Sequence, residues 1–176
     1  SDGGMRMAMI DFCIEVPIRP EWRNVDLLRT SILTCLAAVF HSEDLSHTVS
    51  MVAGELIENA IKFGDWRSDE SSFRLHVHGD REELAVEVSN PYPADSDGPR
   101  RVQSIIETLG EYATAKDAYT ARLRELGEMP MGANESRLGL LRIAYEGGCD
   151  LQALDDPNNV LRIRATTPLR AGGSLD

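Results

Sequence analysis

Several features that define whole classes of protein are scarce in this sequence of 176 residues. Cysteine occurs only at Cys13, Cys35 and Cys149, without CxxC spacing. This pattern argues against a disulfide framework or a cysteine zinc site and predicts buried thiols in a reducing compartment. No apolar run approaches the roughly 18 residues that a membrane span needs, and no glycine-rich phosphate loop is present. We therefore expect a chain that does not enter a membrane and is not a P-loop protein.

Basic residues are also in the minority, because 18 Lys and Arg stand against 29 Asp and Glu, which gives a formal net charge of −11. Such a charge repels phosphate backbones and disfavours nucleic acid and anionic membranes as partners. Charged residues interrupt the N-terminal segment at Asp11, Glu15 and Arg19, whereas a signal peptide has an unbroken apolar run. These observations predict a cytoplasmic protein.

The chain length predicts a single domain with a sizeable core. The opening Ser1-Asp2-Gly3-Gly4 resembles the remnant of an expression tag, so we expect residues 1–10 to be a tag remnant and flexible N-terminus. We expect the domain itself to span residues 11–168 and residues 169–176 to form a frayed tail.

The pattern of apolar residues predicts both strands and helices. Alternation predicts five strands, the last four forming two hairpins: 11–18, 73–78, 84–88, 150–154 and 160–166. Helical spacing predicts a helix over 21–40, another from Ser42 or Ser46 to Phe63 or Trp66, and two or three more between residues 102 and 147. The predicted fold is therefore α+β, a two-layer sandwich in which helices cover one face of a mixed, mostly antiparallel sheet.

The second predicted helix carries a narrow polar stripe. Glu55, Asn59 and Lys62 lie at i, i+4 and i+7 and so share one side of the helix. The other side is expected to face the core and holds Val49, Ala53, Leu56, Ala60 and Phe63. Spacing alone favours the plain interpretation of the stripe, which is a solvated helix face.

The same three side chains also suit a magnesium-bound triphosphate. Mg²⁺ needs only one or two protein oxygens, and an asparagine amide supplies one. A glutamate one turn earlier can take the proton of an acceptor hydroxyl, and a lysine can neutralise phosphate charge. A binding stripe is thus the alternative to a solvated face.

The run Glu55-x-x-x-Asn59-Ala60-x-Lys62-Phe63 resembles the N box of the GHKL superfamily of histidine kinase-like ATPases, also called the Bergerat fold. That superfamily includes gyrase, histidine kinases and anti-sigma-factor serine kinases. The resemblance covers about residues 11–166, in which the order of predicted elements also fits. It implies a GHKL-type sandwich in which Glu55 is the catalytic base, Asn59 binds Mg²⁺ and Lys62 approaches phosphate.

The second and third motifs of that superfamily are altered in this chain. Where the second has an adenine-binding Asp followed by glycines, the sequence reads Ser89-Asn90-Pro91-Tyr92-Pro93, so Asn90 would contact adenine, with Asp97-Gly98 as a displaced alternative. The glycine-rich third box corresponds to the run Ser136–Ile143. Gly139 can offer helix-terminal amides to phosphate and Arg137 can add charge, whereas close packing of the helix against the sheet is the alternative role of Gly139.

A predicted helical insert, residues 100–128, replaces the flexible lid of the family. This pattern resembles the small bacterial partner-switching kinases. The resemblance implies a regulator that binds ATP and Mg²⁺ and phosphorylates a serine or threonine on a STAS-type anti-sigma-factor antagonist, or that engages a sigma-factor-like protein. The alternative is a silent interaction module that sequesters a partner. The sequence leaves open whether the chain forms a homodimer.

The four histidines are scattered, at His41, His47, His76 and His78. His76 and His78 share a strand face, but we identify no nearby set of cysteines or carboxylates that would complete a metal site. We therefore expect surface or packing roles for these histidines and no metal site.

Overall fold

The computed structural model describes residues 10–17, 22–40, 42–67, 71–128 and 136–169. Its elements follow one another as β1 (Ile10–Val16), α1 (Trp22–Val39), α2 (Glu43–Phe63), β2 (Phe73–Gly79), β3 (Glu83–Pro91), α3 (Gly98–Glu111), α4 (Ala115–Glu128), α5 (Ser136–Tyr145), β4 (Asp150–Asp156) and β5 (Val160–Pro168). Every strand and helix expected from the sequence is present, with ends shifted by a few residues.

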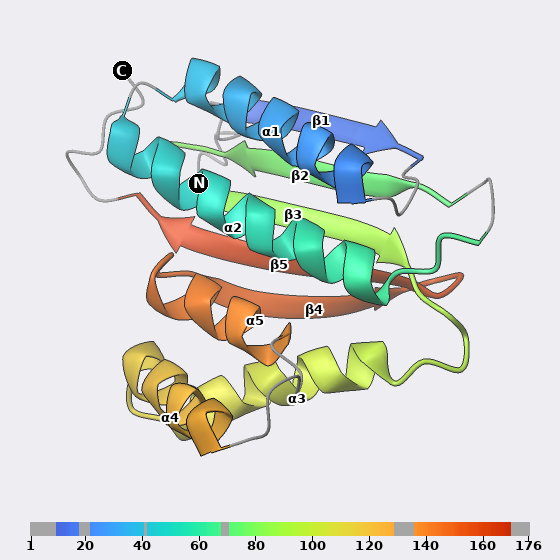
Figure 1. Ribbon diagram of the computed structural model, residues 1–176. Coiled ribbons are helices and arrows are strands. Elements are labelled where there is room, and N and C mark those ends of the chain that lie inside the picture. Colours follow the sequence, from blue (N-terminus) through green and yellow to red (C-terminus); the bar gives the residue numbers. More distant parts are fainter. Residues whose placement is uncertain (1–9, 18–21, 41, 68–70, 129–135, 170–176) are drawn as a thin grey trace, which may run out of the picture.

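The strands form one open sheet in the order β1-β2-β3-β5-β4, with helices α1, α2 and α5 lying over one face (Figure 1). All four neighbouring pairs are antiparallel. The α+β sandwich is therefore confirmed, but the expectation of a mixed sheet is wrong for the described strands. Between β1 and β2 the chain runs through two helices, so it reverses direction three times and returns antiparallel to β1.

Helix α2 supplies the centre of the core. Ser42 caps its N-terminus, where the hydroxyl accepts a hydrogen bond from the Leu45 backbone N–H at 3.3 Å. The inward positions predicted from the sequence are buried, except that Phe63 is only partly covered: Val49, Ala53, Leu56 and Ala60. The polar stripe of Glu55, Asn59 and Lys62 lies outside this buried side of the helix.

The two strand hairpins have turns whose residues suit them. In the β2–β3 turn, Asp80 Oδ1 accepts hydrogen bonds from the backbone N–H groups of Glu82 at 2.7 Å and Glu83 at 3.1 Å. In the β4–β5 turn, Asn158 and Asn159 both adopt left-handed backbone conformations, with φ of 67° and 57°. Asparagine tolerates this conformation better than most residues, which favours a tight hairpin here.

The cysteines depart from the prediction, because only Cys149 is buried while Cys13 and Cys35 are exposed. Cys13 falls between the inward residues Phe12 and Ile14 on β1, so strand alternation turns it outward. Cys35 lies on the outer side of α1, next to buried Leu36. The number of cysteines does not reveal which of them are exposed. Exposure depends on the side of the strand or helix on which each cysteine lies.

The predicted insert at residues 100–128 is helical, as expected, and forms α3 and α4. Helix α3 begins at Gly98 with Pro99 in its first turn, and it packs near β4 and α5. Across the described ranges, no helix has the length and apolar character needed to cross a membrane.

Candidate functional site

The polar stripe of α2 splits into a covered part and an exposed part. Glu55 and Asn59 are partly buried, whereas Lys62 at the end of the helix is exposed. Asn59 lines a cavity at the α2–β3–α3 junction, and Lys62 is not among the residues that line it. The structure thus brings Asn59 to an interior hollow and leaves Lys62 at the surface.

That cavity has a volume of about 40 Å³ and a mostly apolar wall. Its polar edge is formed by Asn59 from α2, Asn90 from the end of β3, and Arg101 and backbone from the start of α3. The Asn59 amide nitrogen Nδ2 is buried and has no hydrogen-bond partner among the described residues. Because an unsatisfied buried donor costs about 1–3 kcal/mol, this amide marks a place where a polar ligand would be favourable.

Asn90 lies across the cavity from α2 and is only 5% exposed. Its Nδ2 donates to the Pro91 carbonyl at 3.0 Å, so its side-chain oxygen is the group it can offer to a donor such as an adenine amino group. The segment after Asn90 is firmly held, since the Pro91 carbonyl also accepts from Asp65 N–H at 2.7 Å and Tyr92 N–H donates to Asn159 at 2.9 Å. Proline and these hydrogen bonds make the segment rigid, whereas glycines would make it flexible.

A second, open hollow of about 410 Å³ adjoins the cavity, with Tyr92, Pro99 and Leu161 lining both. Asp97, the displaced alternative to Asn90, lines this outer hollow. Its carboxylate accepts a hydrogen bond from Arg101 Nε at 3.1 Å. The Tyr92 hydroxyl donates to Asp155 at 2.6 Å, and this hydrogen bond raises the Tyr92 pKa. The outer hollow is therefore more polar than the inner cavity.

Glu55 faces helix α5, where the third motif lies. Its carboxylate accepts a hydrogen bond from Arg142 Nη1 at 3.0 Å. A Cβ atom at Gly139 would lie 2.5 Å from Glu55 Oε2, so a side chain at this position would require the carboxylate to move. The first and third motifs thus meet in a direct contact. The neighbour of Gly139 on its Cβ side is therefore Glu55 of α2.

Arg142 is the site residue that sequence reasoning missed. It also donates to Glu146 at 2.7 Å, and its hydrogen bonds to Glu146 and then to Glu55 raise its pKa. A signal existed, because Arg142 follows Gly139 by three residues and so lies on the same helix face. The side chain of Arg137, predicted to contribute charge, lies outside the described part of the structure.

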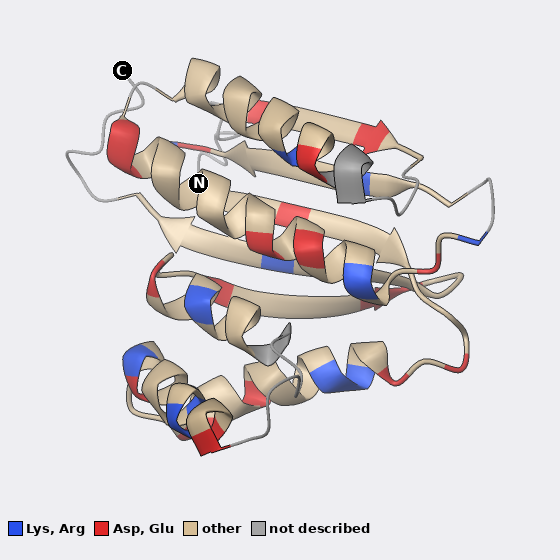
Figure 2. Cartoon of the chain, viewed as in Figure 1, with Lys and Arg blue, Asp and Glu red and all other residues tan. Residues whose placement is uncertain are grey.

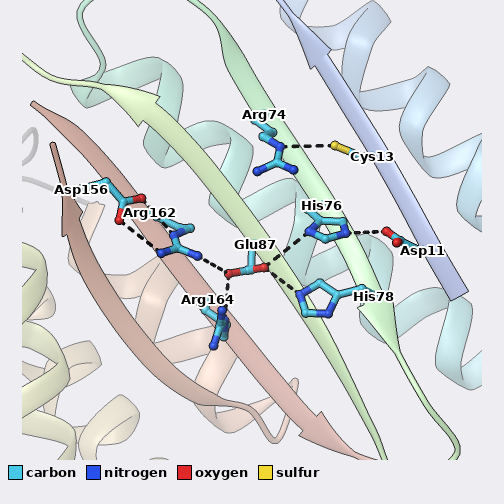
Figure 3. Close-up of polar contacts among 9 residues, drawn as sticks. All are labelled: Asp11, Cys13, Arg74, His76, His78, Glu87, Asp156, Arg162 and Arg164. Atoms are coloured by element: carbon cyan, nitrogen blue, oxygen red, sulfur yellow. Dashed lines mark hydrogen bonds and ion pairs between the residues drawn. The ribbon is translucent and has the colours of Figure 1, made fainter. Parts of the chain in front are cut away.

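On the face of the sheet that no described helix covers, called the uncovered face below, the structure places a carboxylate beside His76 and His78. Glu87 on the neighbouring strand lies between them, 2.7 Å from His78 Nε2 and 3.6 Å from His76 Nδ1 (Figure 3). A carboxylate therefore does accompany the two histidines. Sequence distance hid it, because the pairing of β2 with β3, and not proximity along the chain, places His76 opposite Glu87.

Glu87 is buried, and on the side away from the histidines it contacts two arginines of β5. Arg164 Nε donates to its Oε1 at 2.8 Å and Arg162 Nη1 at 3.3 Å. Burial alone would raise the Glu87 pKa, but the hydrogen bonds from Arg164 and His78 outweigh it and hold the pKa below its usual value. The carboxylate is thus kept ionised within a network that runs from β1 to β5.

Comparison with solved structures finds a similar fold in a chain of the SiaB–SiaC complex from Pseudomonas aeruginosa. The TM-score is 0.56 and the identity 15%, over 93% of this chain and 91% of that chain. At this level of identity the similarity shows a shared fold. No protein-family model matches the sequence, and no curated protein matches it.

Proposed function

We propose that this chain is a bacterial signalling regulator of the GHKL type that binds Mg-ATP beside α2 and phosphorylates a serine or threonine of a small STAS-type antagonist. The observation that carries the proposal is the unpartnered Asn59 amide, which lines a cavity together with Asn90 and the start of α3. Glu55 stands one turn before it on the same helix. The similar chain of known structure was solved in a complex with another protein, which supports a protein partner.

In this proposal the polar edge of the cavity holds the nucleotide. Rotation of the Asn59 amide exchanges its nitrogen and oxygen, so this position can present an acceptor to Mg²⁺. Asn90 would accept the adenine amino group. The start of α3 is basic in sequence, with Arg100 and Arg101, and lies across from the basic last turn of α2 (Figure 2). These side chains and the α3 N-terminus would attract phosphate. Bound magnesium would neutralise phosphate charge during transfer.

The space available supports binding across both hollows. Ligand pockets commonly measure about 300–1,000 Å³, whereas the inner cavity measures about 40 Å³ and the outer hollow about 410 Å³. The outer hollow would therefore hold most of a nucleotide. The polar groups of the inner cavity would bind only its edge.

Glu55 would accept the proton of the acceptor hydroxyl. Its present hydrogen bond with Arg142 occupies one of its oxygens. If Arg142 turned toward Glu146, its other partner at 2.7 Å, or toward phosphate, both oxygens of Glu55 would be open to the acceptor. Arg142 would thus determine when Glu55 is available.

The Glu55–Arg142 ion pair also favours a second candidate function, a silent module that sequesters a regulatory partner. In that case Glu55 and Arg142 only join α2 to α5, and the prolines after Asn90 reflect a lost nucleotide site. The two functions differ in ligand binding, which is directly measurable.

Calorimetric titration with Mg-ATP tests the proposal first. We expect saturable binding that loses its magnesium dependence in Asn59→Ala and persists in Glu55→Gln. Glu58→Gln is the matched control, because Glu58 also pairs with an arginine, Arg29 at 2.6 Å, but faces α1. An absence of binding by the unaltered protein would overturn ATP binding and leave the silent module.

Phosphoryl transfer is tested with γ-labelled ATP and STAS-type proteins encoded near this gene. We expect label on a serine or threonine of one of them, transfer abolished in Glu55→Gln and retained in Glu58→Gln. Binding of ATP without transfer to any such protein, or equal transfer by both variants, would contradict the role of Glu55.

A further inference from the structure

The uncovered sheet face carries a cluster that the proposed function does not use. We infer that His76, His78 and Glu87 form a binding site for a divalent transition-metal ion of the zinc class. The site lies on the face of the sheet opposite α2, so it stands or falls independently of ATP binding (Figures 1 and 3).

Strand geometry brings the three ligands together. His76 and His78 are two residues apart on β2 and so point to the same face, and His76 lies opposite Glu87 in the β2–β3 register. Their imidazole rings stack with centroids 4.3 Å apart. One ligand atom from each of the three residues lies within 4.8 Å of the others. Tetrahedral zinc, with bonds of about 2.0–2.2 Å to nitrogen and oxygen, fits among such atoms after small side-chain rotations.

Asp11 on β1 acts as a positioning residue for His76. Its carboxylate can only accept, so the 2.6 Å contact with His76 Nε2 places a proton on that nitrogen. In the neutral ring His76 Nδ1 is then left with a lone pair, 3.6 Å from the ionised Glu87 oxygen Oε2. Two electron-rich atoms that face each other favour a cation between them. A carboxylate behind a ligand histidine is the usual support of a zinc site.

His78 and Glu87 complete the donor set. His78 Nε2 now donates to Glu87 Oε2 at 2.7 Å, and on metal binding His78 takes its other neutral tautomer, with the proton on Nδ1. Arg162 and Arg164 occupy only the other Glu87 oxygen, Oε1. Oε2 therefore stays available to the ion.

The donor types and their exposure define the ligand class. Two imidazoles and one carboxylate favour Zn²⁺, Ni²⁺ or Cu²⁺ over Mg²⁺ or Ca²⁺. The side chains of His76 and His78 are 23% and 32% exposed, so an ion can reach them from solvent. No described helix covers this face, which leaves a fourth coordination position for water.

The test uses the metal-free full-length protein titrated with Co²⁺, a spectroscopic substitute for zinc, and then with Zn²⁺. We expect one equivalent of Co²⁺ to give the visible absorption of a tetrahedral site without a sulfur-to-metal charge-transfer band, and Zn²⁺ to displace it. The missing sulfur band separates this site from exposed Cys13 and Cys35.

Variants locate the site and separate ligands from support. His76→Gln and His78→Gln should each abolish the tetrahedral spectrum, and Asp11→Asn should keep the spectrum but weaken affinity about 10–100-fold. His47→Gln, an exposed histidine on α2, is the control and should bind as the unaltered protein does. The inference is wrong if no tetrahedral Co²⁺ spectrum appears, or if the His76→Gln and His78→Gln double variant, shown to be folded by circular dichroism, binds equally well.

Discussion

The two faces of the sheet differ in whether their buried polar groups have hydrogen-bond partners. On the helix-covered face the interior is apolar, and the buried Asn59 amide nitrogen has no hydrogen-bond partner in the described part of the chain. On the uncovered face Glu87 is also buried, but two arginines and two histidines surround it. A polar ligand would stabilise a buried donor that has no partner, whereas a hydrogen-bonded network stabilises the fold without one. One sheet thus carries an unsatisfied amide on one face and a hydrogen-bonded carboxylate on the other.

Removing Glu87 would break this comparison most severely. Glu87→Ala leaves Arg162 and Arg164, about one-third exposed, without their shared carboxylate, and we expect the free energy of unfolding to fall by about 3 kcal/mol. Urea denaturation measures the loss. Glu15→Ala, an exposed acid on the same face, should change stability by no more than about 0.5 kcal/mol. Equal effects of the two variants would show that the network contributes nothing.

A smaller effect is expected at the contact between α2 and α5 on the covered face. In Gly139→Ala the new methyl group would meet Glu55 Oε2, so the carboxylate must move away from Arg142 and stability should fall by about 1–2 kcal/mol. Gly110→Ala is the matched control, because this glycine in α3 has no neighbour within 4 Å. It should raise stability by up to about 1 kcal/mol. Thermal unfolding of both variants should therefore shift in opposite directions.

The pH dependence of stability sharpens the comparison further. Because the folded-state pKa of Glu87 lies below its ordinary value of 4.5, the unfolded state takes up the proton more readily. The carboxylate thus stabilises the fold above about pH 4.5, and this contribution is lost as the pH falls through the lowered pKa. Urea denaturation at several pH values should show that the unaltered protein is more stable than Glu87→Gln near neutral pH and that this difference in the free energy of unfolding shrinks in acid. A difference that does not change with pH would contradict this.

The smallest effect concerns the thiols. Burial raises the Cys149 pKa to about 11, so this thiol should stay unreactive toward Ellman's reagent at pH 8 in the folded protein. Exposed Cys13 and Cys35 should react. Denaturant should release the third thiol. Three reactive thiols in the native state would show that the α5–β4 junction opens readily.

Much of the fold could be predicted because its signals are local. The periodicity around Leu56 and the turn residues at Asp80 and Asn158 each act within a few positions of the chain. The meeting of Asn59 and Asn90 at one cavity was expected only through a family resemblance. What could not be predicted depends on strand register and helix packing, as in the pairing of His76 with Glu87 and of Glu55 with Arg142.

The strand order has a consequence for how the chain reaches its native state. Strands β2 and β3, like β4 and β5, are joined by short turns, so each hairpin closes with little loss of chain entropy. Among the described strands, β1 pairs only with β2, from which two helices separate it in the sequence. We expect this edge strand to dock late in folding and to open first in native-state hydrogen exchange. Because Asp11 travels with it, opening of β1 would also release His76.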